Sequence, residues 1–114
     1  MEQQTLEKLT KDLGIECITD NIQPDSIVIG AYASDLLSDV MGKAQAGSLW
    51  ITSQVHKNIV AVASLKELSA IVIANERSVS DEVRQHAADE NVVILSPNLP
   101  LFETCGKIFN YLNA

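Results

Sequence analysis

Short apolar runs alternate with segments of helical periodicity along most of this chain, and this alternation restricts its fold more than any other feature. The predicted strands are short and rich in apolar residues, and they cover 26–31, 48–52, 70–74 and 92–96. The predicted helices that follow them cover 34–44, 57–68, 80–89 and 101–112. Strands joined by helices pair in parallel through right-handed crossovers. The sequence therefore predicts a three-layer α/β/α domain with a mainly parallel sheet.

Three local patterns refine this expectation. The run Ser26-Ile27-Val28-Ile29-Gly30-Ala31 has no polar alternation, which predicts a strand buried on both faces with Gly30 near its carboxyl end. A helix is expected over 5–13, with Thr5 as N-cap and Gly14 as its C-terminal stop, followed by a short strand over 15–19. In the last helix, the predicted apolar stripe consists of Leu101, Phe102, Cys105, Ile108, Phe109 and Leu112.

Length and composition limit the class of protein. A chain of 114 residues fits one domain, 1–114, with one core. No apolar run approaches the roughly 20 residues that cross a bilayer, and the first residues do not resemble a secretory signal, so a cytoplasmic location is expected. The net charge of −7 would repel nucleic-acid phosphates and anionic lipids. We therefore expect neither nucleic acid nor membrane as a partner.

The sequence contains no recognisable catalytic or cofactor motif. There is no GxGxxG or GxxxxGK[ST] loop for phosphates. The two histidines, His56 and His86, have no set of ligands at metal spacing, and the cysteines Cys17 and Cys105 stand 88 positions apart. We predict no metal, no cofactor and no enzymatic activity.

Binding residues are expected at the carboxyl ends of the parallel strands. The richest segment follows the predicted strand 48–52, where Thr52, Gln54, His56 and Asn58 can all form hydrogen bonds. With Gly30 they are the candidate ligand- or partner-binding residues. One interpretation is that the polar four only cap the helix and order the turn, and the other is that they form a recognition site.

The chain resembles the DRTGG domain over about residues 26–112. The resemblance lies in Ile27-Val28-Ile29-Gly30-Ala31, Leu49-Trp50-Ile51-Thr52 and Leu101-Phe102-Glu103-Thr104. It is most similar to short stand-alone DRTGG proteins that accompany iron-only hydrogenase genes, and its fold is similar to the N-terminal domain of HPr kinase/phosphatase. Ser53-Gln54-Val55-His56 stands where many members carry Gly-Asp-Arg, and Ala74-Asn75-Glu76 stands in place of Thr-Gly-Gly.

The resemblance implies a non-catalytic regulatory or protein-interaction domain, with a hydrogenase or redox system as the source of its partner. It also implies a homodimer, to whose interface Trp50, Phe109 and Tyr111 could contribute apolar surface. The alternative function is a sensor of a small nucleotide or metabolite, bound at the carboxyl ends of the strands.

Overall fold

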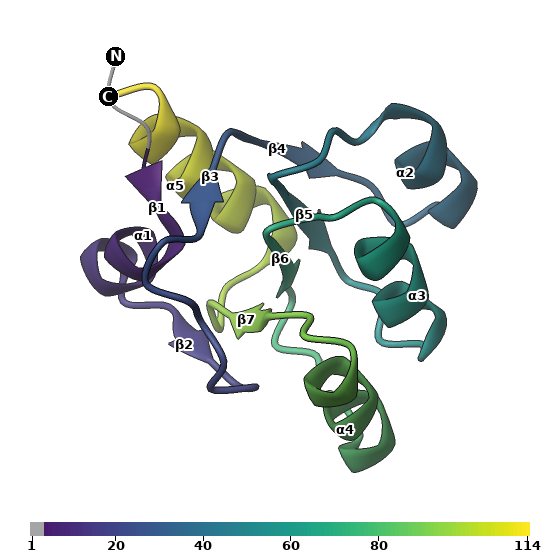
Figure 1. The fold of residues 1–114 in the computed structure, drawn as a ribbon. Helices are drawn as coiled ribbons and strands as arrows, with labels where there is room; N and C mark the ends of the chain where they lie inside the picture. Colours follow the sequence, from purple (N-terminus) through teal and green to yellow (C-terminus); the bar gives the residue numbers. More distant parts are fainter. Residues whose placement is uncertain (1–3) are drawn as a thin grey trace.

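A five-stranded sheet with the order β2-β7-β6-β5-β4 forms the centre of the computed structural model, which describes residues 4–114 (Figure 1). Its strands are β2 (Glu16–Cys17), β4 (Gly30–Ala33), β5 (Ser48–Thr52), β6 (Ala70–Ile73) and β7 (Ile94–Ser96). Strands β4 to β7 run parallel, and β2 is antiparallel to β7. A second, two-stranded sheet pairs β1 (Gln4–Thr5) with β3 (Ile27–Val28) in antiparallel fashion.

Helices cover both faces of the central sheet. They are α1 (Leu6–Leu13), α2 (Leu37–Lys43), α3 (Asn58–Leu65), α4 (Asp81–Asp89) and α5 (Leu101–Leu112). The helices α2, α3 and α4 lie on one side of the sheet, and α1 and α5 lie on the other (Figure 1). The predicted three-layer α/β/α architecture with a mainly parallel sheet is thus confirmed.

Two apolar cores result, one on each face, because alternate residues of a strand point to opposite sides. In β5, Trp50 packs with α2, α3 and α4, whereas Leu49 and Ile51 pack with α1 and α5. In β6, Ile71 and Ile73 belong to the first core. The continuous apolar runs of these two strands are therefore explained by burial on both faces.

The prediction of one buried strand over 26–31 is wrong. The segment is divided between β3, in the small sheet, and β4, which pairs through Gly30–Ala33 with β5 at the sheet edge. Ile27 and Ile29 are 41% and 51% exposed. A six-residue apolar run is long enough for two short strands, and composition alone does not reveal where the chain passes from one sheet to the other.

Two predictions about apolar side chains also need correction. Trp50 is fully buried, so it cannot contribute to an interface. In α5, Phe102 and Phe109 lie on the outer face, 86% and 66% exposed, while Ile108 is buried against the sheet. The helix therefore has a buried apolar face and a second, exposed one.

The N-terminal helix begins and ends as its sequence predicts. Thr5 Oγ1 accepts a hydrogen bond from the Lys8 N–H at 3.2 Å, and Gly14 ends the helix with a left-handed φ of 66°. Such a conformation favours glycine because it has no Cβ.

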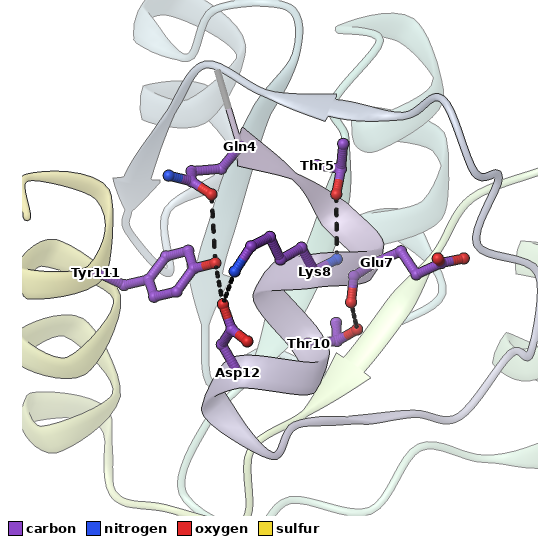
Figure 2. Close-up of polar contacts among 7 residues, drawn as sticks. All are labelled: Gln4, Thr5, Glu7, Lys8, Thr10, Asp12 and Tyr111. Atoms are coloured by element: carbon purple, nitrogen blue, oxygen red, sulfur yellow. Dashed lines mark hydrogen bonds and ion pairs between the residues drawn. The ribbon is translucent and has the colours of Figure 1, made fainter. Parts of the chain in front are cut away.

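A polar cluster then joins this helix to the last one (Figure 2). The Tyr111 hydroxyl donates to Asp12 Oδ2 at 2.7 Å, and Gln4 Oε1, a second possible acceptor, lies 3.3 Å from the same hydroxyl oxygen. Lys8 pairs with the same Asp12 oxygen, and the hydrogen bonds from Lys8 and Tyr111 lower the pKa of Asp12. Segments about a hundred residues apart in sequence are thereby connected.

Candidate functional site

The carboxyl ends of β4, β5, β6 and β7 lie along one edge of the sheet, as parallel pairing requires. Asp35, which follows β4, is the polar centre of this edge. Its Oδ1 accepts hydrogen bonds from Thr52 Oγ1 at 2.7 Å and from the Ser53 N–H at 2.8 Å, and its Oδ2 accepts one from Ser53 Oγ at 2.7 Å. One carboxylate therefore fastens the loop after β4 to the end of β5.

The bonding pattern around Asp35 favours its charged form. Partial desolvation by itself raises the pKa of Asp35, but the backbone N–H of Ser53, the hydroxyls of Thr52 and Ser53, and the positive charge of Arg77 outweigh it. The net result is a pKa below the ordinary value. At neutral pH this side chain is a carboxylate, available only as an acceptor.

The residues just before Asp35 reinforce the same connection. The Ser34 N–H donates to the Ile51 carbonyl at 3.1 Å, and the Ser34 carbonyl accepts from Trp50 Nε1 at 2.8 Å. These bonds hold 34–36 against β5, so α2 begins only at Leu37 and has no side-chain cap. The predicted helix over 34–44 is shorter for this reason.

The four polar residues after β5 do not cap α3. The N-cap position is Lys57, with no side-chain hydrogen bond to the helix. Thr52 is fully buried, and its hydroxyl oxygen accepts from the Gln54 N–H at 3.1 Å, which orders the turn. The capping interpretation is therefore wrong for this helix, and only its turn-ordering part applies, through Thr52.

Three of these side chains have no hydrogen-bond partner within residues 4–114. They belong to Gln54, which is half-buried, and to His56 and Asn58, which are exposed. Their backbone is held in place from both sides, by the Asp35 contacts at Ser53 and by α3. Two unbonded polar side chains, those of Gln54 and His56, thus stand on a positioned loop and a third, that of Asn58, begins α3, whereas the Thr52 hydroxyl holds that loop.

Gly30 does not belong to this group. It is the first residue of β4 and pairs with Ser48, the first residue of β5, at the amino end of the sheet. Its φ is not left-handed, and a Cβ built there would meet Ser48 Oγ at an ordinary 3.8 Å. The expectation that Gly30 ends a strand beside the binding loops is wrong, because the strand begins at Gly30 and ends at Ala33.

The loops after β6 and β7 are tied to each other. The Asn75 N–H donates to the Leu99 carbonyl at 2.7 Å, and Asn75 Oδ1 accepts from the Leu101 N–H at 2.7 Å. Asn75 and Glu76 have left-handed φ angles of 63° and 54°, a backbone that favours glycine. The turn after β6 is thus formed by two successive non-glycine residues with a left-handed backbone.

Asp35 is a site residue that the sequence pattern does not single out. The signal that could reveal it is a carboxylate two residues past a strand end, together with hydroxyl residues at the end of the neighbouring strand. A strand over 26–31 and a helix over 34–44 place Asp35 inside the helix, and not at the edge of the sheet.

Neither a cluster of metal-ligating side chains nor a membrane-spanning helix occurs among the described residues. Within 4–114, no three His, Cys, Asp or Glu side chains are grouped as a metal ion would need. None of the helices that the structure describes has the length and apolar character to cross a bilayer.

Comparison with known proteins supports the fold. No protein-family model matches the chain, and no curated protein matches it significantly. The chain is similar in structure to a solved structure of the CBS and DRTGG domains of the regulatory region of Clostridium perfringens pyrophosphatase, in complex with the activator diadenosine tetraphosphate. The TM-score is 0.71 at 15% identity, over 91% of this chain and 45% of that chain, so this chain spans less than half of it. The resemblance to DRTGG domains is thus confirmed at the level of the fold.

Proposed function

We propose that this protein is a non-catalytic regulatory module that recognises a partner through Gln54, His56 and Asn58. The observation that supports the proposal is the state of these side chains. None of them is bonded within the described chain, yet Gln54 and His56 stand on a loop that Asp35 holds through Ser53, and Asn58 begins α3. A positioned loop with free polar groups loses little conformational entropy on binding. The resemblance to stand-alone DRTGG proteins points to a hydrogenase or redox system as the source of the partner.

The arrangement of the same residues argues against hydrolytic catalysis. A serine nucleophile needs a base within hydrogen-bond reach of its hydroxyl, usually a histidine. Here Ser53 Oγ donates directly to Asp35, and His56 makes no hydrogen bond to either residue. The regulatory role is also in keeping with the fold, which is shared with the regulatory region of a pyrophosphatase.

A capture experiment tests this proposal. The double variant Gln54→Ala/His56→Ala is compared as bait with the wild-type protein in a lysate of the native organism. Gln85→Ala/His86→Ala is the matched control, because it removes the same two residue types from α4. We expect the first variant to lose a partner that the wild type and the control retain, with all three equally folded by circular dichroism. Identical partner lists for the three baits would refute the recognition role.

We also propose that two copies of the chain associate through the groove between β4 and α5. The groove has a volume of about 650 Å³, and none of the described residues that line it is charged, in a chain with a net charge of −7. Its exposed apolar side chains are Ile29, Phe102 and Phe109, at 51%, 86% and 66% exposure.

A second copy is the occupant that fits these observations. An uncharged face is where two acidic molecules can approach with the least repulsion. The strand β4 is also an edge of the sheet, with only β5 beside it, so its free side can pair with the same strand of a symmetric partner. Small residues on that strand, Ala31 and Ala33, would allow close approach.

Sedimentation of three proteins tests the dimer. We expect the wild-type chain of 12.4 kDa to sediment as a dimer at micromolar concentration. Phe102→Ser/Phe109→Ser should give monomers, whereas Leu65→Ser, which removes a 73% exposed leucine on α3, should not. A monomeric wild type, or a dimer that survives the double variant, would show that this groove is not the interface.

We propose a second function, the sensing of a small ligand, which is supported by a cavity away from Gln54, His56 and Asn58. A cavity of about 330 Å³ lies beside the carboxyl end of β7, lined by Ser96 and by residues of the loop after β6. Its size falls within the range of small-molecule sites. The regulatory region that this chain resembles over 45% of its length was solved with the activator diadenosine tetraphosphate, which gives a precedent for ligand sensing by a protein that contains this fold.

A further inference from the structure

Both arginines of the chain, Arg77 and Arg84, line the 330 Å³ cavity beside β7. Arg77 belongs to the loop after β6, and Arg84 belongs to α4. The other six basic residues are lysines, and none of them lines this cavity. In a protein with fifteen acidic and eight basic residues, two guanidinium-bearing residues at one cavity form a local concentration of positive charge.

Neither guanidinium group is bonded to another of the described residues. Among residues 4–114, no hydrogen bond or salt bridge involves the side chain of Arg77 or Arg84. Arg77 interacts with Asp35 only through the field of its charge. One acidic residue, Glu76, also lines the cavity, which leaves a local charge of about +1 among its lining side chains. Unpaired guanidinium groups offer planar pairs of N–H donors that match phosphate or carboxylate oxygens.

The remaining lining residues suit an anion with an organic part. Ser78, Ser96 and Asn98 can donate further hydrogen bonds, while Ile18 and Val79 provide apolar surface. Ile18 and Arg84 also line an adjoining hollow of about 340 Å³, so the space continues beyond the arginines, where the carboxylate of Asp81 favours an uncharged part of the ligand over a second anionic group. A ligand larger than a free anion can therefore be accommodated.

The rim of the cavity is held in a defined geometry. Asn75, at the start of the arginine-bearing loop, is hydrogen-bonded to the chain at Leu99 and Leu101. Glu76 and Asn98, which both line the cavity, have left-handed φ angles of 54° and 60°. Non-glycine residues adopt this conformation at a cost, and such residues gather at binding sites.

We infer that Arg77 and Arg84 form a binding site for the phosphate group of a small molecule. The inference rests on the second function proposed above, ligand sensing, and not on partner recognition by Gln54, His56 and Asn58. It assigns the ligand a class: a compact phosphate ester or diphosphate, with its phosphate between the two guanidinium groups and any organic portion toward Ile18 and Val79.

Calorimetric titration with pyrophosphate and with ADP, both without added metal, tests the site. We expect the wild-type protein to bind at least one of them, and Arg77→Gln and Arg84→Gln each to weaken binding at least tenfold. Lys11→Gln is the matched control, since it removes one positive charge from α1, which does not line this cavity. It should bind like the wild type. Raising the salt concentration should also weaken binding, because charge attraction is screened.

The titrations with ADP and pyrophosphate show whether the site exists and which part of the ligand it recognises. Stronger binding of ADP than of pyrophosphate would show that the apolar wall is used, and equal binding would assign recognition to the phosphate alone. Absence of binding to both probes, or equal affinities in wild type and arginine variants with unchanged thermal midpoints, would overturn the site. The capture experiment uses variants of Gln54 and His56 and does not involve the arginines. A failure of phosphate binding would therefore not contradict the proposed recognition of a partner.

Discussion

At the level of single residues, Asp35 has the largest influence on how the edge of the sheet is arranged. It accepts three hydrogen bonds from Thr52 and Ser53, and the hydroxyl of Thr52 is fully buried. Replacement by Ala would leave that hydroxyl without its acceptor in the protein interior. We expect Asp35→Ala to lower the free energy of unfolding by about 1–3 kcal/mol, measured by urea denaturation. A loss of unfolding free energy below a few tenths of a kcal/mol would mean that water replaces the carboxylate as the acceptor of the Thr52 hydroxyl.

The charge of Asp35 makes a pH-dependent contribution to stability. Its folded-state pKa lies below the value in the unfolded chain, about 3.9, so the contribution is present above that pH and is lost as the pH falls through the lowered pKa. We therefore expect the difference in thermal midpoint between wild type and Asp35→Asn to be largest near neutral pH and to shrink below about pH 4. A difference that is constant across this range would contradict the assignment.

Two glycines should respond differently to the same substitution. Gly14 has a left-handed φ of 66°, which strains any residue with a Cβ, whereas Gly30 has neither a left-handed φ nor a close neighbour. We expect Gly14→Ala to destabilise the protein by about 1 kcal/mol and Gly30→Ala to change its stability by less than about 0.5 kcal/mol. Thermal unfolding of both variants measures this. Equal losses would show that the backbone around Gly30 is more restricted than its geometry indicates.

At the level of elements, the sequence predicted those whose signals are local. The cap at Thr5, the stop at Gly14 and the buried runs of β5 and β6 all lie within the segments they define. The division of 26–31 depends on β1 and β5, which are distant in sequence, and no local pattern encodes it. Because the strand is predicted over 26–31 and not over 30–33, Gly30 is included in the predicted site and Asp35 is not.

The last helix provides a second element-scale test, because its apolar residues lie on two faces. Ile108 is 1% exposed in the core, whereas Phe109 beside it is 66% exposed. We expect Ile108→Ala to cost about 2–5 kcal/mol of unfolding free energy through the cavity it leaves. At monomeric concentrations, Phe109→Ala should cost less than about 0.5 kcal/mol. Similar losses for both would indicate that Phe109 packs within the monomer.

At the level of the whole molecule, the cluster of Gln4, Lys8, Asp12 and Tyr111 connects the two ends of the described chain (Figure 2). Tyr111→Phe removes the hydroxyl that bridges α5 to α1 and should destabilise the protein by about 1 kcal/mol. Hydrogen exchange gives a sharper readout: amides of α1 should exchange faster in the variant, while those of α4 should not. Uniform acceleration across both helices would argue against a local connection.

The placement of Trp50 has an optical consequence. As the only tryptophan, it is the sole source of indole emission, and its side chain is fully buried with Nε1 bonded to the Ser34 carbonyl. Its emission therefore comes from a dry, fixed environment and reports on the peptide unit beside Asp35. Because Ser34 directly precedes Asp35, we expect a ligand or partner that moves Asp35 to change this indole emission, so that native fluorescence can follow binding at the edge of the sheet without a label.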